Sequence, residues 1–239
     1  MLKKGMIVLL GGILLISCGK KSYTELMSMG NEYMEKSEMG KALEAYREAV
    51  YVAEEPAQII AAADKLGDIF VQHVPNPDSA GTYYAIILDY PDELNVETLR
   101  EYTKLIHESG NYGVAARGYA MWLERYNDNP LAPSMAYDLA ELYHKQIQDL
   151  IRAVQLYDQV VTDYPDSPFA PKALFSAGYV YANDLKNLEK ARAKYETFLA
   201  SYPKHEMVPS VQFELRYLGK SIEEIPELQH LVGRKKSSS

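Results

Sequence analysis

The feature that most limits how this chain can fold is a repeat of 38 residues, which keeps one register through three successive copies. Five columns of residues define it: Ala115, Ala153 and Ala191; Tyr119, Tyr157 and Tyr195; Trp122, Val160 and Phe198; Tyr126, Tyr164 and Tyr202; Pro133, Pro171 and Pro209. A period of this size is typical of proteins that stack one small unit many times, each unit packing only on its neighbours. We therefore expect a stack of similar units.

Each copy of the repeat predicts a pair of helices. In the last copy Ala191, Tyr195, Phe198 and Tyr202 are spaced four, three and four residues apart, so they share one face of a helix. That helix is expected to end at Tyr202, because Pro203 has no N–H and disfavours helical geometry in the residue before it. A second proline in each copy suits the first turn of the next helix. The repeating unit is therefore a helical hairpin.

Earlier copies are found by running the register backwards. This predicts Ser79, Tyr83, Ile86 and Pro91 in one earlier copy, and Ala42, Tyr46 and Ala49 in the first. Small residues mark the point where the two helices of a hairpin approach: Gly30, Gly67, Ala140 and Gly178, with Thr103 as the exception. The chain has 20 tyrosines against 5 phenylalanines. We expect most repeat-column tyrosines to fill the space between hairpins while the hydroxyl reaches a wet edge.

The order of small residue, aromatic residue, alanine, aromatic residue and proline resembles the tetratricopeptide repeat. The first copy matches best, with Leu26, Met29, Gly30, Tyr33, Ala42, Tyr46 and Ala49, and the third copy is weakest. The resemblance implies an all-α, right-handed superhelical solenoid of about five hairpins over residues 23–218, closed by a C-terminal capping helix near Val208 to Tyr217. In residues 219–239 we expect a short helix, opened by a capping box of Ser221 and Glu224, and a disordered tail from Arg234.

The first residues predict export. Lys3 and Lys4 precede an apolar run over residues 6–16, which is shorter than the roughly 20 residues that span a bilayer and fits a secretory signal. The sequence Leu15-Ile16-Ser17-Cys18 resembles the bacterial lipobox. This resemblance implies a signal peptide over residues 1–17, cleavage before Cys18, lipidation of that cysteine and a lipid-anchored linker over residues 18–22. The alternative is an ordinary cleaved signal with an incidental cysteine.

Residue 19 suggests which membrane holds the anchor. In families that use the residue after the lipidated cysteine as an address, an aspartate indicates retention at the inner membrane, whereas this chain has Gly19. We therefore expect an outer-membrane lipoprotein that faces the periplasm, tethered by several acyl chains, since one chain alone binds a membrane marginally.

Composition and motifs argue against several classes of function. With 33 acidic and 25 basic residues the formal net charge is −8, and no dense Lys/Arg block suits nucleic acid. One cysteine cannot form an internal disulfide, and the histidines are too scattered to suggest a metal site. Gly219-Lys220-Ser221 resembles the end of a phosphate-binding loop, but the position five residues before Gly219, where that loop needs a glycine, holds Glu214. We predict a protein that is not an enzyme and has no cofactor.

The concave face of such a solenoid is built by the first helix of each hairpin, and it is our candidate binding site. Counting from the small residue of each first helix predicts these groove residues: Asn31, Asp64, Asp68, Arg100, Lys104, His107, Tyr137, Glu141, His144, Phe175 and Tyr179. Aromatic residues in a groove commonly anchor a partner peptide. The alternative is that they pack on neighbouring helices. Replacing Tyr137, Phe175 and Tyr179 by alanine tests this: we predict weaker partner capture without unfolding.

The two last copies are similar to BamD-like lipoproteins of the outer-membrane β-barrel assembly machinery, over Tyr157 to Ala170 and Ala191 to His205. The resemblance implies a non-enzymatic scaffold that binds envelope proteins. Two alternatives stay open. One is an envelope coordinator of the kind that works with the Tol and Pal system, and the other is an envelope enzyme or a lipoprotein that binds glycan or peptidoglycan.

Overall fold

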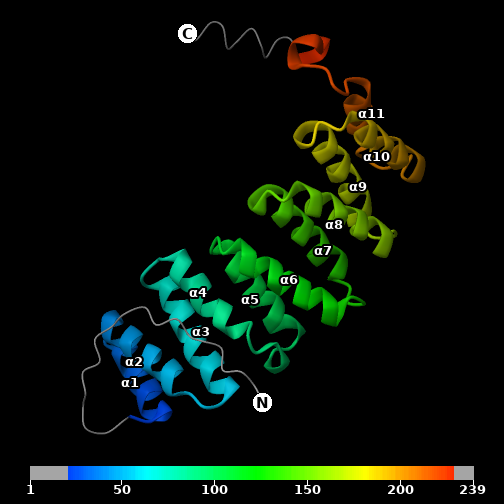
Figure 1. Cartoon of the computed structure of the whole chain (residues 1–239). Coiled ribbons are helices and arrows are strands. Elements are labelled where there is room, and N and C mark those ends of the chain that lie inside the picture. The colour runs from blue at the N-terminus through cyan, green and yellow to red at the C-terminus, as the bar shows by residue number, and fades with distance from the viewer. Residues whose placement is uncertain (1–20, 229–239) are drawn as a thin grey trace, which may run out of the picture.

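The computed structural model describes residues 21–228, which form helices and turns without a β-strand. Helices that follow one another in sequence pack as hairpins, and the hairpins stack into an elongated array (Figure 1). The five hairpins and the last helix are α1 (Tyr23–Glu35) and α2 (Met39–Val52); α3 (Pro56–Gln72) and α4 (Pro77–Ile87); α5 (Val96–Glu108) and α6 (Tyr112–Tyr126); α7 (Ala132–Leu142) and α8 (Leu150–Asp163); α9 (Phe169–Tyr179) and α10 (Leu188–Ser201); and α11 (Val208–Arg216). The predicted all-α solenoid is confirmed.

Shorter helical turns join or extend these elements. Two π-helical turns, Tyr143–Ile147 and Val180–Asp184, continue α7 and α9. Three 3-10 turns lie at Pro91–Glu93, Ile222–Glu224 and Pro226–Leu228. The π turns widen the ends of the first helices of hairpins four and five, on the side where the candidate groove residues lie.

The ends of the helices follow from local sequence. Ser22 and Glu25 form a capping box at the start of α1: the N–H of Ser22 donates to the Glu25 carboxylate at 2.7 Å, and the N–H of Glu25 donates to Ser22 Oγ at 3.3 Å. Other helices start at a polar side chain that accepts a backbone N–H, namely Asn76, Asn95, Asp149 and Asn187. Tyr164 and Tyr202 are the C-caps of α8 and α10, as the prolines that follow them predict.

Buried tyrosines hold the two helices of each hairpin together. The ring of Tyr84 on α4 lies directly over Gly67 on α3, so a Cβ added to Gly67 would come within 2.3 Å of it. Tyr195 on α10 crosses Gly178 on α9 in the same way, with a corresponding distance of 2.6 Å. Contacts this short leave no room for any side chain. The predicted small residue is therefore the place where the aromatic ring passes between the helices.

In the third hairpin the small residue at the helix crossing lies on the second helix instead of the first. Thr103 on α5 is fully buried, and its hydroxyl donates to the carbonyl of Leu99 at 2.7 Å. The facing residue on α6 is Gly118, where an added Cβ would lie 2.5 Å from Thr103 Oγ1. The missing small residue on the first helix is thus compensated by a glycine on the second.

The register predicted for the second hairpin is wrong by one residue. Ala80, Tyr84 and Ile87 are buried, whereas Ser79, Tyr83 and Ile86 are only half-buried. The predicted Tyr83 lies 36 residues before Tyr119 and the buried Tyr84 lies 35 residues before it, so the spacing of 38 residues in the later hairpins does not extend to this one. Tyr83 lies outside the hairpin core: its ring stacks on Phe70 with centroids 5.8 Å apart, and its hydroxyl accepts from Arg47 Nε at 2.8 Å.

The C-terminal part of the described chain closes the stack. α11 packs on α10 and buries Val211, as expected for the first helix of an unfinished sixth hairpin. The N–H of Ser221 donates to the Glu224 carboxylate at 2.8 Å and opens a 3-10 turn. The predicted signal peptide, Cys18 and the predicted tail from Arg234 lie outside the described residues. Among residues 21–228 no helix has the length and apolar character needed to cross a membrane.

Candidate functional site

The tyrosines of the second helices extend through the hairpins and place their hydroxyls beside the first helices. The hydroxyl of Tyr46 donates to Asn31 at 2.7 Å, that of Tyr84 to Asp68 at 3.1 Å, that of Tyr119 lies 3.1 Å from His107 Nδ1, and that of Tyr157 donates to Glu141 and lies 3.4 Å from His144 Nδ1. Four hairpins therefore use a predicted groove residue as partner for a buried tyrosine. These hydroxyls meet a polar row of side chains on the first helices.

The acidic end of the groove lies on α3. Asp64 accepts a hydrogen bond from the hydroxyl of Tyr102 at 3.0 Å, and burial raises the pKa of its carboxyl. Neither Asp64 nor Asp68 forms an ion pair among the described residues. Arg100 does not approach them as a partner, because its guanidinium pairs with Glu97 at 2.7 Å on the same helix. The two aspartates give this part of the groove a negative character.

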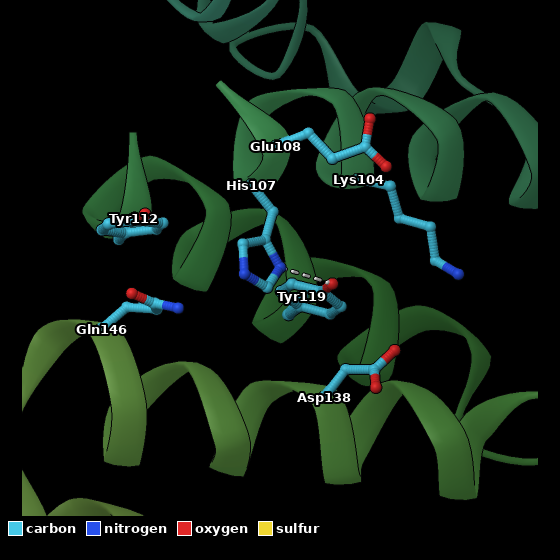
Figure 2. Close-up of a pocket in the computed structure, with 7 residues that line it drawn as sticks. All are labelled: Lys104, His107, Glu108, Tyr112, Tyr119, Asp138 and Gln146. Atoms are coloured by element: carbon cyan, nitrogen blue, oxygen red, sulfur yellow. Dashed lines mark hydrogen bonds between the residues drawn. The ribbon is translucent and has the colours of Figure 1, made fainter. Parts of the chain in front are cut away.

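A cavity of about 430 Å³ lies between the third and fourth hairpins (Figure 2). Its lining comes from α5, α6, α7 and the π turn after α7: Lys104, His107, Glu108, Tyr112, Tyr119, Asp138 and Gln146. Burial lowers the pKa of His107 and raises the pKa of Asp138. Two carboxylates face one lysine here, so we call this the acidic cavity.

A second cavity, also of about 430 Å³, lies between the fourth hairpin, the fifth hairpin and the start of α11. Its lining residues are Tyr137, Glu141, His144, Lys145, Lys172, Phe175, Ser176, Tyr179 and Met207. Three of these are aromatic and one is a methionine, which gives the cavity apolar walls. We call it the aromatic cavity.

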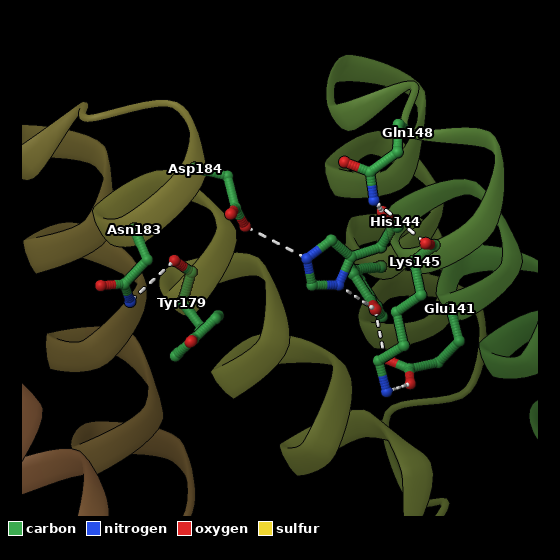
Figure 3. A network of polar contacts seen from close by, with 8 residues as sticks. Glu141, His144, Lys145, Gln148, Tyr179, Asn183 and Asp184 are labelled. Carbon is green, nitrogen blue, oxygen red and sulfur yellow. Dashed lines mark hydrogen bonds and ion pairs between the residues drawn. The ribbon is translucent and has the colours of Figure 1, made fainter.

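A network of polar contacts crosses from the fourth to the fifth hairpin beside the aromatic cavity (Figure 3). His144 Nε2 lies 3.1 Å from a carboxylate oxygen of Asp184, which belongs to the π turn after α9. Glu141 accepts from Tyr157 and also pairs with Lys145. The contact between His144 and Asp184 joins the two sides of the cavity. Lys172, which also lines the cavity, forms no ion pair among the described residues.

The three aromatic groove residues differ in their surroundings. The ring of Tyr137 lies between those of Tyr157 and Phe169, with centroids 5.7 and 5.6 Å away. Phe175 packs on Tyr195 at 6.0 Å, whereas Tyr179 is 40% exposed. Tyr137 and Phe175 are therefore half-buried packing residues that also line the cavity. Tyr179 is the aromatic residue most available to a partner.

The structure brings together some predicted groove residues and separates others. Tyr137, Glu141, His144, Phe175 and Tyr179 share the aromatic cavity; Lys104 and His107 share the acidic cavity; and Asn31, Asp64, Asp68 and Arg100 line neither cavity. Sequence reasoning missed Asp138, Lys172 and Met207. Asp138 lies two residues before Ala140, a position that the counting rule omitted, and Met207 precedes a helix outside the five hairpins.

The described residues hold no group of three or more His, Cys, Asp and Glu side chains arranged to bind a metal ion. The polar groups of both cavities can bind charged or hydrogen-bonding groups of a partner.

Comparison with known proteins agrees with the hairpin geometry. Residues 135–167 and 172–205, which span α7 to α10, match the model of the tetratricopeptide repeat. The fourth and fifth hairpins are therefore similar to tetratricopeptide repeats. These repeats typically serve as protein-interaction scaffolds. No curated protein matches the sequence significantly.

Similar solved structures include other helical-repeat proteins. A tetratricopeptide repeat protein from Parabacteroides merdae ATCC 43184 is 18% identical, covering 91% of this chain and 80% of that chain with a TM-score of 0.44. BtubC from P. vanneervenii is 18% identical, covering 89% and 90% with a TM-score of 0.45. YrrB, described as a TPR protein with an unusual peptide-binding site, is 15% identical, covering 82% and 100% with a TM-score of 0.44. All three TM-scores are below 0.5, so these likenesses do not indicate the function of this chain.

Proposed function

We propose that this protein is a non-enzymatic scaffold that captures a segment of a partner protein in the aromatic cavity. The observation that carries this proposal is the convergence of Tyr137, Phe175 and Tyr179 on one cavity, with Tyr179 40% exposed. A large exposed aromatic side chain in a concave site is the usual anchor of a protein interface. Tetratricopeptide repeats bind peptide partners in such a groove, which supports the same reading.

We propose that this scaffold lies at the bacterial cell envelope. Its support is the pattern of the first eighteen residues, which ends in Cys18 and resembles a lipoprotein signal. A lipid on Cys18 would hold the hairpins at the periplasmic side of an outer membrane, within reach of other envelope proteins. The partner class that we propose first is a component of the β-barrel assembly machinery, because of the resemblance of the last two hairpins to its lipoproteins.

Crosslinking in intact cells tests partner capture. A photoreactive amino acid at Tyr179 should form a light-dependent adduct with a partner protein. The matched control is the same substitution at Tyr51, which is 71% exposed on α2 and lines neither cavity. Adducts at both positions, or at neither, would contradict capture in the aromatic cavity.

The identity of the captured protein separates the envelope roles. Recovery of a barrel insertase supports the assembly role, and a Pal-type protein supports a Tol–Pal coordinator instead. Binding of purified peptidoglycan in the absence of any protein supports a glycan-binding lipoprotein.

The anchor has its own test. Cys18→Ser should release the protein from the membrane fraction, and mass spectrometry of the mature N-terminal peptide should show lipid on Cys18. An unmodified thiol on the mature protein would contradict the anchor.

A further inference from the structure

We infer that the segment bound in the aromatic cavity carries a large apolar side chain next to a carboxylate. The inference rests on the proposed function, since it names the chemistry of the partner that the same cavity would take. Three observations support it: the apolar walls of the cavity, its unpaired cation and a buried hydroxyl without an acceptor beside it.

The apolar part of the partner follows from the walls. Phe175, Tyr179 and Met207 bring two rings and a thioether together from α9 and the start of α11. Aromatic and methionine side chains adapt well to an inserted apolar group. A cavity of about 430 Å³ can hold one large side chain together with part of the backbone that carries it.

The charge of the aromatic cavity favours a carboxylate next to the apolar side chain of the partner. Glu141 already pairs with Lys145 and accepts from Tyr157, and His144 is engaged by Asp184. Lys172 makes no ion pair among the described residues, and its ammonium lies 5.4 Å from the ring centroid of Phe169. One positive charge therefore stays uncompensated at the rim. A carboxylate of the partner can pair with it, whereas a lysine there would be repelled.

The acidic cavity shows that this charge is not a general property of the groove. It has the same volume, yet Glu108 and Asp138 outnumber its one lysine, Lys104. An acidic segment would be repelled there. The groove therefore offers one site of each sign, and an acidic–apolar segment fits only the aromatic cavity.

Tyr195 supplies the third observation. It is fully buried, and its hydroxyl has no hydrogen-bond partner among residues 21–228, whereas the equivalent tyrosines of the other four hairpins each have one on the first helix. Its ring passes Gly178 and packs on Phe175, a lining residue of the aromatic cavity. Burial, together with the nearby Glu214 and Tyr179, raises the pKa of its hydroxyl. A buried donor without an acceptor is unfavourable. A carbonyl oxygen of a bound segment would satisfy it after a movement of Tyr179.

Fluorescence anisotropy with synthetic peptides tests this chemistry on the full mature chain in detergent micelles. The probes are three labelled Gly/Ser dodecapeptides that differ only in a central Phe-Asp, Phe-Lys or Ala-Asp pair. We expect the Phe-Asp peptide to bind about tenfold more tightly than either of the others. Lys172→Glu should reverse the preference toward Phe-Lys. The matched control, Lys104→Glu in the acidic cavity, should leave the preference unchanged.

Equal affinities for Phe-Asp and Phe-Lys, no effect of Lys172→Glu, or no binding of any peptide at about 1 mM would overturn the inference. Sequencing of the partner segment crosslinked from Tyr179 gives a second readout, in which an Asp or Glu should lie within two residues of a large apolar side chain. If Tyr179 captures a segment without that pair, the inference fails while the proposed function stands. If Tyr179 captures nothing, both fail.

Discussion

The third and fifth hairpins have the same architecture, and they differ in both packing and surface chemistry. In the fifth, the glycine lies on the first helix, where Gly178 meets the ring of Tyr195; in the third, the first helix carries Thr103 and the glycine is Gly118 on the second. The third hairpin borders the acidic cavity and the fifth borders the aromatic cavity, each of about 430 Å³.

The comparison separates what the fold requires from what it leaves free. One small residue must lie at the crossing point of the two helices, but either helix can supply it. The residues one turn away on the groove side are not needed for that crossing, so they can be acidic, basic or aromatic. The binding chemistry of the groove can therefore vary along the stack while the hairpins stay alike.

The largest difference is expected at Phe175 and its third-hairpin equivalent, Arg100, which both lie three residues before the crossing point. Phe175→Ala should lower the free energy of unfolding by about 2 kcal/mol, because the half-buried ring packs on Tyr195. Arg100→Ala should change it by less than about 0.5 kcal/mol, because Arg100 makes an ion pair with a largely exposed glutamate. Urea unfolding followed by circular dichroism measures both. Equal losses would show that the two first helices pack alike.

The next largest effect on stability is expected at the helix crossing of the third hairpin, where Gly118 meets Thr103. Gly118→Ala should lower the free energy of unfolding by about 1–2 kcal/mol, since the new Cβ would meet Thr103 Oγ1 at 2.5 Å. Adding Thr103→Ala should restore most of this loss, because it removes the colliding atoms and the helix gains from Gly to Ala. A double-mutant cycle in urea measures the coupling. Additive losses would contradict compensation between Thr103 and Gly118.

A smaller difference in stability is expected between removing the hydroxyl of Tyr119 and removing that of Tyr195. Tyr119→Phe should cost about 1 kcal/mol, because it leaves His107 Nδ1 without its partner in a half-buried site. Tyr195→Phe should leave the free energy of unfolding unchanged or slightly raised, because the hydroxyl that it removes has no acceptor in the described part of the chain. Matched urea titrations of the two variants give the comparison. A loss at Tyr195 as large as that at Tyr119 would show that its hydroxyl is satisfied.

Periodicity predicted the hairpins, because the apolar face and the prolines of each copy are fixed by helix geometry. It misplaced the tyrosine of the second hairpin by one residue, at Tyr83 instead of Tyr84, because the spacing to the third hairpin is shorter than 38 residues and a short turn can absorb such a change without altering the hairpin. Thr103 looked like an exception for a related reason: its compensation is at Gly118, on the other helix. The misplaced tyrosine and the compensation at Gly118 both concern how one helix is placed relative to the next, which local sequence does not determine.

The sequence predicted the candidate site about as fully as it predicted the hairpins. Counting along the first helices found five residues of the aromatic cavity, because residues at one register of successive first helices face the same side. It could not show that Asn31, Asp68 and Glu141 accept hydrogen bonds from buried tyrosines, which depends on how far each ring reaches between the helices. Nor could it find Met207, whose place in the cavity depends on the angle at which α11 follows the fifth hairpin.

The smallest expected effect is the response of the acidic cavity to pH, through His107. Burial lowers the pKa of His107 below its ordinary value of about 6.5, and this effect outweighs the opposing charges of Asp138 and Glu108. As the pH falls below that value, the unfolded chain takes up the proton before the folded chain does. The stability that neutral His107 contributes is therefore full above about pH 6.5 and is lost as the pH falls through its lowered pKa.

His107→Gln isolates this contribution, because glutamine can still accept a hydrogen bond from Tyr119 but does not titrate. Between pH 7.5 and 5, a range of about two and a half pH units around the ordinary histidine pKa, the wild type should lose more stability than the variant, by less than about 1 kcal/mol since the site is only partly buried. Burial raises the pKa of Asp138, which acts in the opposite direction at lower pH in both proteins, and the charge of His107 partly opposes that rise. The difference between the two proteins therefore reports on His107 together with its coupling to Asp138. Parallel pH profiles would show that His107 is solvated in the folded chain, and the acidic cavity would then be an open surface instead of a partly desolvated site.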